Sequence, residues 1–199
     1  MPVIECDPTV AKATLEAEGI EILPGNTEHE HWRAARGEAT AVAYDNKVVV
    51  QGARPSDLTA LLREDGTGEA SLYFDGASRG NPGPSAIGWV LATDDTVVAA
   101  DGTTIGRATN NQAEYEALLA GLQAASDYGF DELSIHGDSE LVINQLTGAW
   151  ETNDPVLREH RVTARELLEE FETWSATHVP RELNERADQL ANDALDDAQ

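Results

Sequence analysis

Strand-like and helix-like segments alternate through the last two-thirds of the chain, and four short acidic motifs mark where they begin or end. These motifs carry Asp75, Glu114, Asp138 and Asp188. Carboxylates gathered from distant parts of a chain repel one another, which raises their pKa values unless a cation neutralises them. A pair of divalent metal ions held by carboxylates is a common device for cleaving phosphodiester bonds. The four motifs therefore predict a metal-dependent nuclease.

The order of the segments predicts an α/β fold in which helices flank a mixed five-stranded sheet. The hydrophobic pattern gives the order βββαβααβα. Gly129 ends the first helix, and Pro155 opens the third, which the pattern extends through Val162 to Phe171. Strands are predicted at 70–75, 86–92, 96–101, 132–136 and 177–179, and helices at 110–128, 139–146, 155–171 and 184–195.

This order also predicts how the four carboxylates meet. The strand ending at His136 is expected beside the strand ending at Asp75, which brings Asp138 next to Asp75. Glu114 lies one turn into a helix that can cross the sheet, and Asp188 can project from the last helix. Taken singly, each has an ordinary alternative as a turn residue, a helix cap or a solvated helix carboxylate. Only the joint pattern favours a shared site.

The first third of the chain is predicted to form a separate small α+β module. A polar, glycine-rich stretch at 64–69 places the boundary between residues 1–68 and residues 69–199. Within the module the pattern predicts a helix at 9–18, a hairpin at 39–50 that turns at Asp45-Asn46, and a short helix at 55–62.

The net charge of the chain affects whether it can bind nucleic acid. The 199 residues carry a formal net charge of −24, and Lys12 and Lys47 are the only lysines. Cationic side chains supply most non-specific affinity for nucleic acid, but this contribution collapses in very high salt. The balance therefore fits either a protein that does not touch nucleic acid or a halophilic one. Dispersed acidic residues and an ordinary hydrophobic fraction of 41% favour a folded halophilic protein.

Other features of the sequence bound its location. Cys6 is the only cysteine, so no intrachain disulfide can form, which fits a reducing compartment. The sequence has no apolar run long enough to span a membrane, and its start lacks the pattern of a signal peptide. We therefore expect a cytoplasmic monomer with no membrane contact.

Together the four motifs resemble those of the ribonuclease H type 1 family. The resemblance covers about residues 69–196. It implies an endonuclease that hydrolyses the RNA strand of RNA–DNA hybrids, leaves 5′-phosphate and 3′-hydroxyl ends, and removes R-loops and replication primers. The motifs are Tyr-Phe-Asp75-Gly-Ala-Ser-Arg-Gly-Asn81-Pro-Gly-Pro, Thr-Asn110-Asn111-Gln-Ala-Glu114-Tyr, Gly-Asp138-Ser139-Glu-Leu-Val and Val-Pro-Arg181-Glu-Leu-Asn184-Glu-Arg-Ala-Asp188.

The resemblance also implies roles for individual residues. Asp75, Glu114, Asp138 and Asp188 match the four metal-binding carboxylates, which are expected to hold two Mg²⁺ or Mn²⁺ ions about 4 Å apart over the scissile phosphate. In this scheme Asp75 bridges both ions, Glu114 and Asp138 hold the ion on the nucleophile side, and Asp188 holds the other. Positions expected to contact the hybrid, where 2′-hydroxyls distinguish RNA from DNA, are Gly76, Ala77, Ser78, Asn81, Asn110, Asn111 and Ser139.

Two residues are candidates for aiding proton transfer or product release. His178, ten residues before Asp188, matches a loop histidine of the family's bacterial branch. Arg181, seven residues before Asp188, belongs to a form of that loop in which an arginine can take the same role. Both are therefore retained as candidate catalytic residues.

The chain departs from the bacterial branch in ways that affect substrate binding. That branch has a basic protruding helix between the third and fourth motifs, whereas residues 148–159 hold no basic cluster, and Glu140 replaces an uncharged polar residue. Binding is therefore expected to rest on the metals, backbone amides and the N-terminal module. The hairpin at 44–52 weakly resembles part of the substrate-binding domain of bacterial type 3 ribonucleases H; the alternative is a structural or solubilising appendage.

Two other functions stay open from the sequence. One keeps the fold but cuts DNA, as a recombinase or junction resolvase does. The other is a non-catalytic protein that binds hybrids or buffers cations. The presence of all four carboxylates argues against the non-catalytic alternative.

Overall fold

The computed structural model describes residues 1–62, 68–93 and 96–198 of the chain. Contacts divide the chain into two compact units, Met1–Gly68 with Ser126–Phe130, and Glu69–Ala125 with Asp131–Gln199. Most of the predicted boundary stretch, at 64–67, lies outside the described residues. Each unit is described by itself below.

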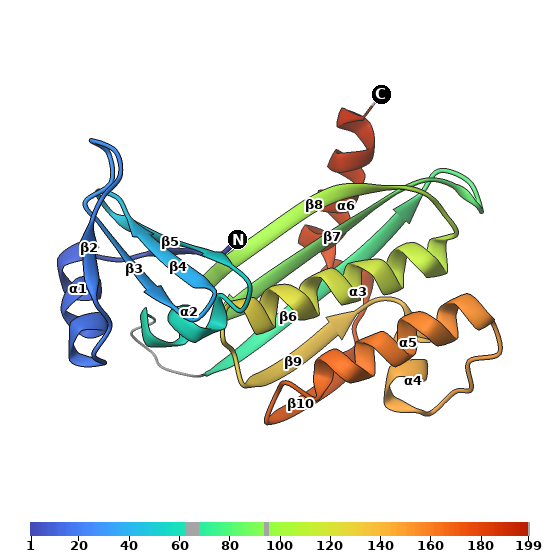
Figure 1. The fold of residues 1–199 in the computed structure, drawn as a ribbon. Coiled ribbons are helices and arrows are strands. Elements are labelled where there is room, and N and C mark those ends of the chain that lie inside the picture. Colours follow the sequence, from blue (N-terminus) through green and yellow to red (C-terminus); the bar gives the residue numbers. More distant parts are fainter. Residues whose placement is uncertain (63–67, 94–95, 199) are drawn as a thin grey trace. The chain divides into compact units, whose positions relative to one another are not determined.

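The second unit is built on a mixed five-stranded sheet with flanking helices, as the sequence predicts (Figure 1). Its strand order is β10-β9-β6-β7-β8, and the central β6 pairs in parallel with β9 and antiparallel with β7. The elements are β6 (Glu69–Ser78), β7 (Gly83–Thr93), β8 (Thr96–Ala108), α3 (Asn110–Asp127), β9 (Glu132–Gly137), α4 (Glu140–Thr147), α5 (Pro155–Leu168), β10 (Thr173–His178), the 3-10 turn η1 (Arg181–Leu183) and α6 (Glu185–Asp197).

Helices cover both faces of this sheet, α3 and α5 on one and α6 on the other (Figure 1). Small residues allow the close approach on each face. A Cβ on Gly121 of α3 would lie 2.4 Å from the Leu72 side chain, and a Cβ on Gly88 of β7 would lie 2.3 Å from the carbonyl oxygen of Ala187 in α6. The core between the sheet and α3 is fully buried and includes Leu72, Phe74, Leu118, Leu122 and Ile135.

Several predicted boundaries in this unit are wrong in detail. β6 continues past its predicted end at Asp75 to Ser78, and β7 begins at Gly83, because the two strands stay paired as far as Ser78 and Ser85. β8 continues to Ala108, past the Asp101-Gly102 turn signal, because it stays paired with β7 along its length. β10 begins at Thr173, earlier than predicted, because it pairs with the whole of β9.

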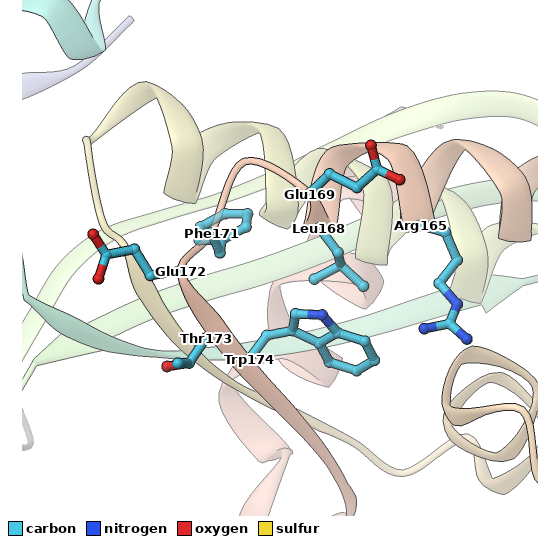
Figure 2. Close-up of a pocket in the computed structure, with 7 residues that line it drawn as sticks. All are labelled: Arg165, Leu168, Glu169, Phe171, Glu172, Thr173 and Trp174. Atoms are coloured by element: carbon cyan, nitrogen blue, oxygen red, sulfur yellow. The ribbon is translucent and has the colours of Figure 1, made fainter.

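The end of α5 also differs from the prediction. The helix stops at Leu168, so Phe171 lies beyond it, on the turn that leads to β10 (Figure 2). Within the helix, Val162 is 51% exposed. Val162 follows the buried Leu157 by five residues, which places it about 140° around the helix and away from the core. The predicted end was too late because Phe171 is a buried apolar residue that follows the helix, and the hydrophobic pattern counted it as helical.

The first unit is a second five-stranded sheet, of order β1-β5-β4-β3-β2, with every neighbouring pair antiparallel. Its hydrophobic core centres on Leu15, Trp32, Val48, Val50 and Leu58. The predicted hairpin and both predicted helices are present. The sequence pattern does not predict β1, β2 or β3, because β1 and β2 have only three residues each and β3, Trp-Arg-Ala-Ala-Arg, does not alternate strictly between apolar and polar residues. The elements are β1 (Val3–Glu5), α1 (Pro8–Ala17), β2 (Ile22–Pro24), β3 (Trp32–Arg36), β4 (Ala39–Ala43), β5 (Lys47–Gly52) and α2 (Ser56–Leu62).

Local hydrogen bonds explain how α1 begins and how β3 is held against it. Asp7 caps α1 by accepting a hydrogen bond from the Thr9 backbone N–H, and Pro8 occupies the first turn, where its missing N–H is not needed. The Trp32 indole donates to the Pro8 carbonyl at 2.9 Å, which ties β3 to the start of α1. Among the described residues, no helix has the length and apolar character that crossing a membrane requires.

Candidate active site

An acidic pocket lies where β6 and β9 end and the helices α3, α4 and α6 begin. All the predicted site residues line it except Asn81, Asn111 and His178. Its lining is Asp75, Gly76, Ala77, Ser78, Asn110, Glu114, Asp138, Ser139, Arg181, Asp188 and Asn192. The topology brings these residues together from four separate stretches of the chain.

The parallel pairing of β6 with β9 sets the first two carboxylates side by side. Phe74 lies opposite Gly137 in the register, so Asp75 and Asp138 follow at the same edge of the sheet. Gly137 has no side chain for a physical reason, since a Cβ there would lie 2.5 Å from the Phe74 ring. The expectation that Asp138 lies beside Asp75 agrees with this register.

Glu114 reaches the same edge because α3 passes very close to β6. A Cβ on Gly76 would lie 2.2 Å from the backbone of Ala113 and Glu114. The Gly76 backbone N–H donates to Glu114 Oε2 at 3.2 Å, which fixes the carboxylate. Asp188 comes from α6 on the other side, one residue after Ala187, which packs against Gly88.

Three of the carboxylates are close enough to share one cation. Asp75, Glu114 and Asp138 each offer an oxygen, and these atoms all lie within 4.8 Å of one another. Asp188 lines the same pocket outside this set of three. The Asp75 and Glu114 residues are only 5% and 6% exposed, so water screens their repulsion poorly.

Burial and mutual repulsion disfavour the charged forms of these acids. Burial first, and then the charges of Asp138 and Asp188, raise the pKa of Asp75 to about 7. Burial and the charges of Asp75 and Asp138 also raise the pKa of Glu114, although hydrogen bonds from Gly76 and Asn110 offset part of this rise. The site therefore holds more negative charge than the protein itself neutralises.

Arg181 is the cation that lines the pocket. Its guanidinium Nη2 hydrogen-bonds Asp188 Oδ1 and forms an ion pair with it. The hydrogen bond and charge of Asp188 raise the pKa of Arg181, with smaller contributions from Asp75 and Asp138. Because the Arg181 side chain is 69% exposed, it neutralises the buried acids only in part.

The donor set fits a hard divalent cation. Carboxylate oxygens are the ligands that Mg²⁺ and Mn²⁺ prefer, and the buried acids provide both the charge and the spacing for such an ion. Asp75, Glu114 and Asp138 would hold one ion directly, and Asp188 stands where it can help to hold a second.

Five of the predicted substrate-binding residues form a rim beside the carboxylates: Gly76, Ala77, Ser78, Asn110 and Ser139. Asn81 Oδ1 accepts from the Asn110 backbone N–H at 3.1 Å, which ties the β6–β7 turn to the start of α3. Ser78 Oγ lies within hydrogen-bonding range of the Ala108 carbonyl at 3.1 Å and accepts from Ser85 Oγ at 2.9 Å. Ser139 caps α4 by accepting from the Val142 backbone N–H at 3.4 Å. Asn111 lies exposed at the start of α3.

His178 lies next to the pocket without lining it. It ends β10, and its Nε2 is 3.1 Å from the Asp138 carbonyl oxygen. Of the two candidates for proton transfer or product release, Arg181 is therefore the one whose side chain faces the carboxylates.

Sequence reasoning missed the roles of two asparagines. Asn192 lines the pocket one turn after Asp188 and donates to its carbonyl at 2.8 Å. Asn184 is buried beneath the pocket, where it donates to the Phe74 carbonyl at 2.9 Å and to Asp138 Oδ1 at 3.4 Å. Asn184 stands in the fourth motif, but only the three-dimensional arrangement shows where its side chain points.

Comparisons with known proteins match this geometry. A family model described as reverse transcriptase-like matches residues 73–194. Ribonuclease HI of Halobacterium salinarum is 61% identical over 199 residues, which are the whole of both chains. The chain belongs to the ribonuclease H type 1 family.

Solved structures of ribonucleases H agree with this assignment. The crystal structure of RNase H1 from the halophilic archaeon Halobacterium salinarum is 67% identical, has a TM-score of 0.64, and covers 65% of this chain and 99% of that chain. LC11-RNase H1, solved in complex with an RNA/DNA hybrid, is 36% identical, has a TM-score of 0.62, and covers 65% of this chain and 97% of that chain. The chain is thus a ribonuclease H, a hydrolase with endonuclease activity.

Proposed function

We propose that this ribonuclease H hydrolyses the RNA strand of RNA–DNA hybrids with the help of two divalent metal ions, Mg²⁺ or Mn²⁺. The observation that carries the proposal is the cluster of buried carboxylates, whose oxygens lie within 4.8 Å of one another at the ends of β6 and β9. The likeness to LC11-RNase H1, whose structure contains an RNA/DNA hybrid, supports the choice of substrate.

The carboxylates have distinct parts in this proposal. Asp75 clusters with Glu114 and Asp138 and also feels the charge of Asp188, so it is the acid that would contact both ions. Glu114 and Asp138 would help to hold one ion and Asp188 the other. Bound there, the ions supply the positive charge that activates a water and stabilises the leaving oxygen. Water attacks the phosphorus and the bond to the 3′-oxygen breaks, which leaves a 3′-hydroxyl on one product and a 5′-phosphate on the other.

The rim of the pocket recognises the strand to be cut. Backbone groups of residues 76–78 and the side chain of Asn110 face the pocket beside the carboxylates. Only RNA offers a 2′-hydroxyl that can both donate to and accept from such groups, so they can select ribose over deoxyribose. Ser139 on this rim, with Asn81 and Asn111 next to it, would hold the backbone of the hybrid.

Arg181 is placed to act on the developing charge. Its guanidinium contacts Asp188, so it can donate hydrogen bonds to phosphate oxygens at the same place or help the product to leave. His178, whose Nε2 is held near the Asp138 carbonyl, is the alternative for this role.

The acidic composition fits work in concentrated salt. At a net charge of −24 the protein repels nucleic acid in dilute buffer, and high salt screens that repulsion. The similarity to a halophilic relative supports this environment. In a cytoplasm of this kind the enzyme would clear R-loops and replication primers as a monomer.

Cleavage of a labelled hybrid tests the proposal and separates it from a DNA-cutting relative. The hybrid is labelled at the end of either strand and incubated in molar salt with Mg²⁺, with Mn²⁺ or with a chelator, beside duplex DNA of the same sequence. We expect metal-dependent cuts in the RNA strand alone. Cuts in the DNA strand, or undiminished cleavage in the chelator, would contradict the proposal.

A further inference from the structure

Asn184 has a buried polar side chain beneath the pocket, and the proposed chemistry does not use it. It is 1% exposed and stands immediately before α6, which begins at Glu185. An asparagine at this position ordinarily caps its helix, because its side-chain oxygen accepts a hydrogen bond from a backbone N–H of the first turn. No such bond is present here.

The side-chain amide of Asn184 turns instead toward the ends of two strands. Its Nδ2 donates to the Phe74 carbonyl at 2.9 Å and to Asp138 Oδ1 at 3.4 Å. Its Oδ1 is buried with no hydrogen-bond partner among the described residues.

The two partners determine the orientation of this amide. A carbonyl and a carboxylate can only accept hydrogen bonds, so reversing the amide would set three acceptors against one another. The observed orientation leaves a buried oxygen unpaired, which is unfavourable. In this orientation Asn184 does not cap α6, and its Oδ1 has no hydrogen-bond partner among the described residues. In return, its Nδ2 donates a hydrogen bond to Asp138.

The contacts of Asn184 join the elements that carry three of the four acids. Phe74 is the residue before Asp75, and Asp138 is held directly. The backbone carbonyl of Asn184 accepts from the Asp188 N–H at 3.1 Å, so the same residue anchors the turn of α6 that carries the fourth acid.

We propose that Asn184 is a positioning residue for the metal site. Its amide holds one oxygen of Asp138, leaves the other oxygen available as a ligand, and fixes the start of α6 against the end of β6. The inference rests on the proposed function of the carboxylates as metal ligands. It assigns to Asn184 a neutral hydrogen-bond donor, which neither an apolar nor an anionic residue can supply.

Substitution by aspartate and by alanine separates this role from simple packing. Asn184→Asp keeps the shape of the side chain but sets an acceptor against two acceptors, whereas Asn184→Ala removes the group. If Asn184 only filled space, the aspartate variant would be the milder of the two. We expect the reverse order, with a loss of about 10–100-fold in Mn²⁺ affinity for Asn184→Ala, as for other residues that orient metal ligands, and a larger loss for Asn184→Asp.

The measurement is a titration of the full chain with Mn²⁺ in molar salt, followed by electron paramagnetic resonance. Unfolding curves in chelator give the folded fraction of each variant, so that affinity is compared per folded molecule. Steady-state cleavage of a hybrid should show a lower kcat with little change in KM. Asn153→Asp, which adds the same charge at an exposed position, is the matched control and should bind Mn²⁺ like the unaltered chain.

Equal Mn²⁺ affinity in Asn184→Asp and the unaltered chain would overturn the inference, as would a loss confined to Asn184→Ala. If the aspartate variant does not fold, Asn184→Ser is the deciding variant. Its hydroxyl can donate a hydrogen bond and should recover part of the Mn²⁺ affinity that is lost in Asn184→Ala. Equal Mn²⁺ affinities of the serine and alanine variants would overturn the inference. Failure of the proposed function is recognised separately, since the unaltered chain would then leave the hybrid uncut whatever the order of the affinities.

Discussion

Replacing Asp75 with asparagine should stabilise the metal-free protein. A carboxyl group whose pKa is raised from 3.8 to about 7 on folding costs free energy whenever it is ionised. The stability of the unaltered chain should therefore fall as pH rises from about 4 to about 7 and change little from this source above that. Asparagine has the same shape and no charge, so its variant avoids this loss.

The size of the effect follows from the same pKa. A rise from 3.8 to about 7 corresponds to about 4 kcal/mol in the free energy of unfolding above pH 7. This is an upper limit, because Asp75, Glu114 and Asp138 repel one another and share the cost. For a chain of this size it corresponds to a gain of roughly 8–16 °C in Tm at most.

The assay is thermal unfolding followed by circular dichroism in molar KCl with a chelator, from pH 4 to pH 9. The two proteins should melt together near pH 4 and separate as the pH rises, with Asp75→Asn the more stable. Added Mg²⁺ should then stabilise the unaltered chain and leave the variant unchanged. Asp193→Asn, an exposed position on α6, is the control and should show neither effect.

Two results would refute this reasoning. One is equal stability of Asp75→Asn and the unaltered chain at pH 8. The other is a difference already complete at pH 4, where the Asp75 carboxyl group is still protonated in the folded state. Either result would mean that the Asp75 carboxylate is not held near other buried anions.

Three further predictions concern charge and domain organisation. Arg181→Gln should destabilise the metal-free protein and raise its affinity for Mn²⁺ in a titration, because no guanidinium then pairs with Asp188. Arg186→Gln, at an exposed position, is the control, and a lower Mn²⁺ affinity of Arg181→Gln would contradict the prediction. The Tm of the full chain should rise from dilute to molar salt as self-repulsion is screened, so an unchanged Tm would count against a halophilic protein. A fragment of residues 69–199 should fold and cleave a hybrid with an unchanged kcat, because a solved relative covers 65% of this chain, which is close to the length of this fragment. Any contribution of residues 1–68 to binding would appear as a higher KM.

More of the candidate site than of the exact strand and helix boundaries could be predicted from the sequence. Asp75, Glu114, Asp138 and Asp188 each stand in a motif at an element end, and the parallel pairing of neighbouring strands brings such ends to one edge of a sheet. Register along a strand depends on its partners, so the true ends of β8 and β10 could not be read from their own residues.

Side-chain direction was the part that sequence could not supply. The fourth motif places Asn184 at the start of a helix, where propensity favours a cap, yet its amide points to Asp138 because two acceptors lie there. Val162 shows the converse, an apolar residue on the solvent side of α5. Both outcomes depend on neighbours that are distant in the chain.

The most direct test of the account is the position of Mn²⁺ in crystals of the protein, located by anomalous diffraction. We predict a peak within coordination distance of Asp75, Glu114 and Asp138 in the unaltered chain and its absence in Asp75→Asn. Peaks only elsewhere in the unaltered chain, or an unchanged peak in the variant, would contradict the claim that these carboxylates form the metal site.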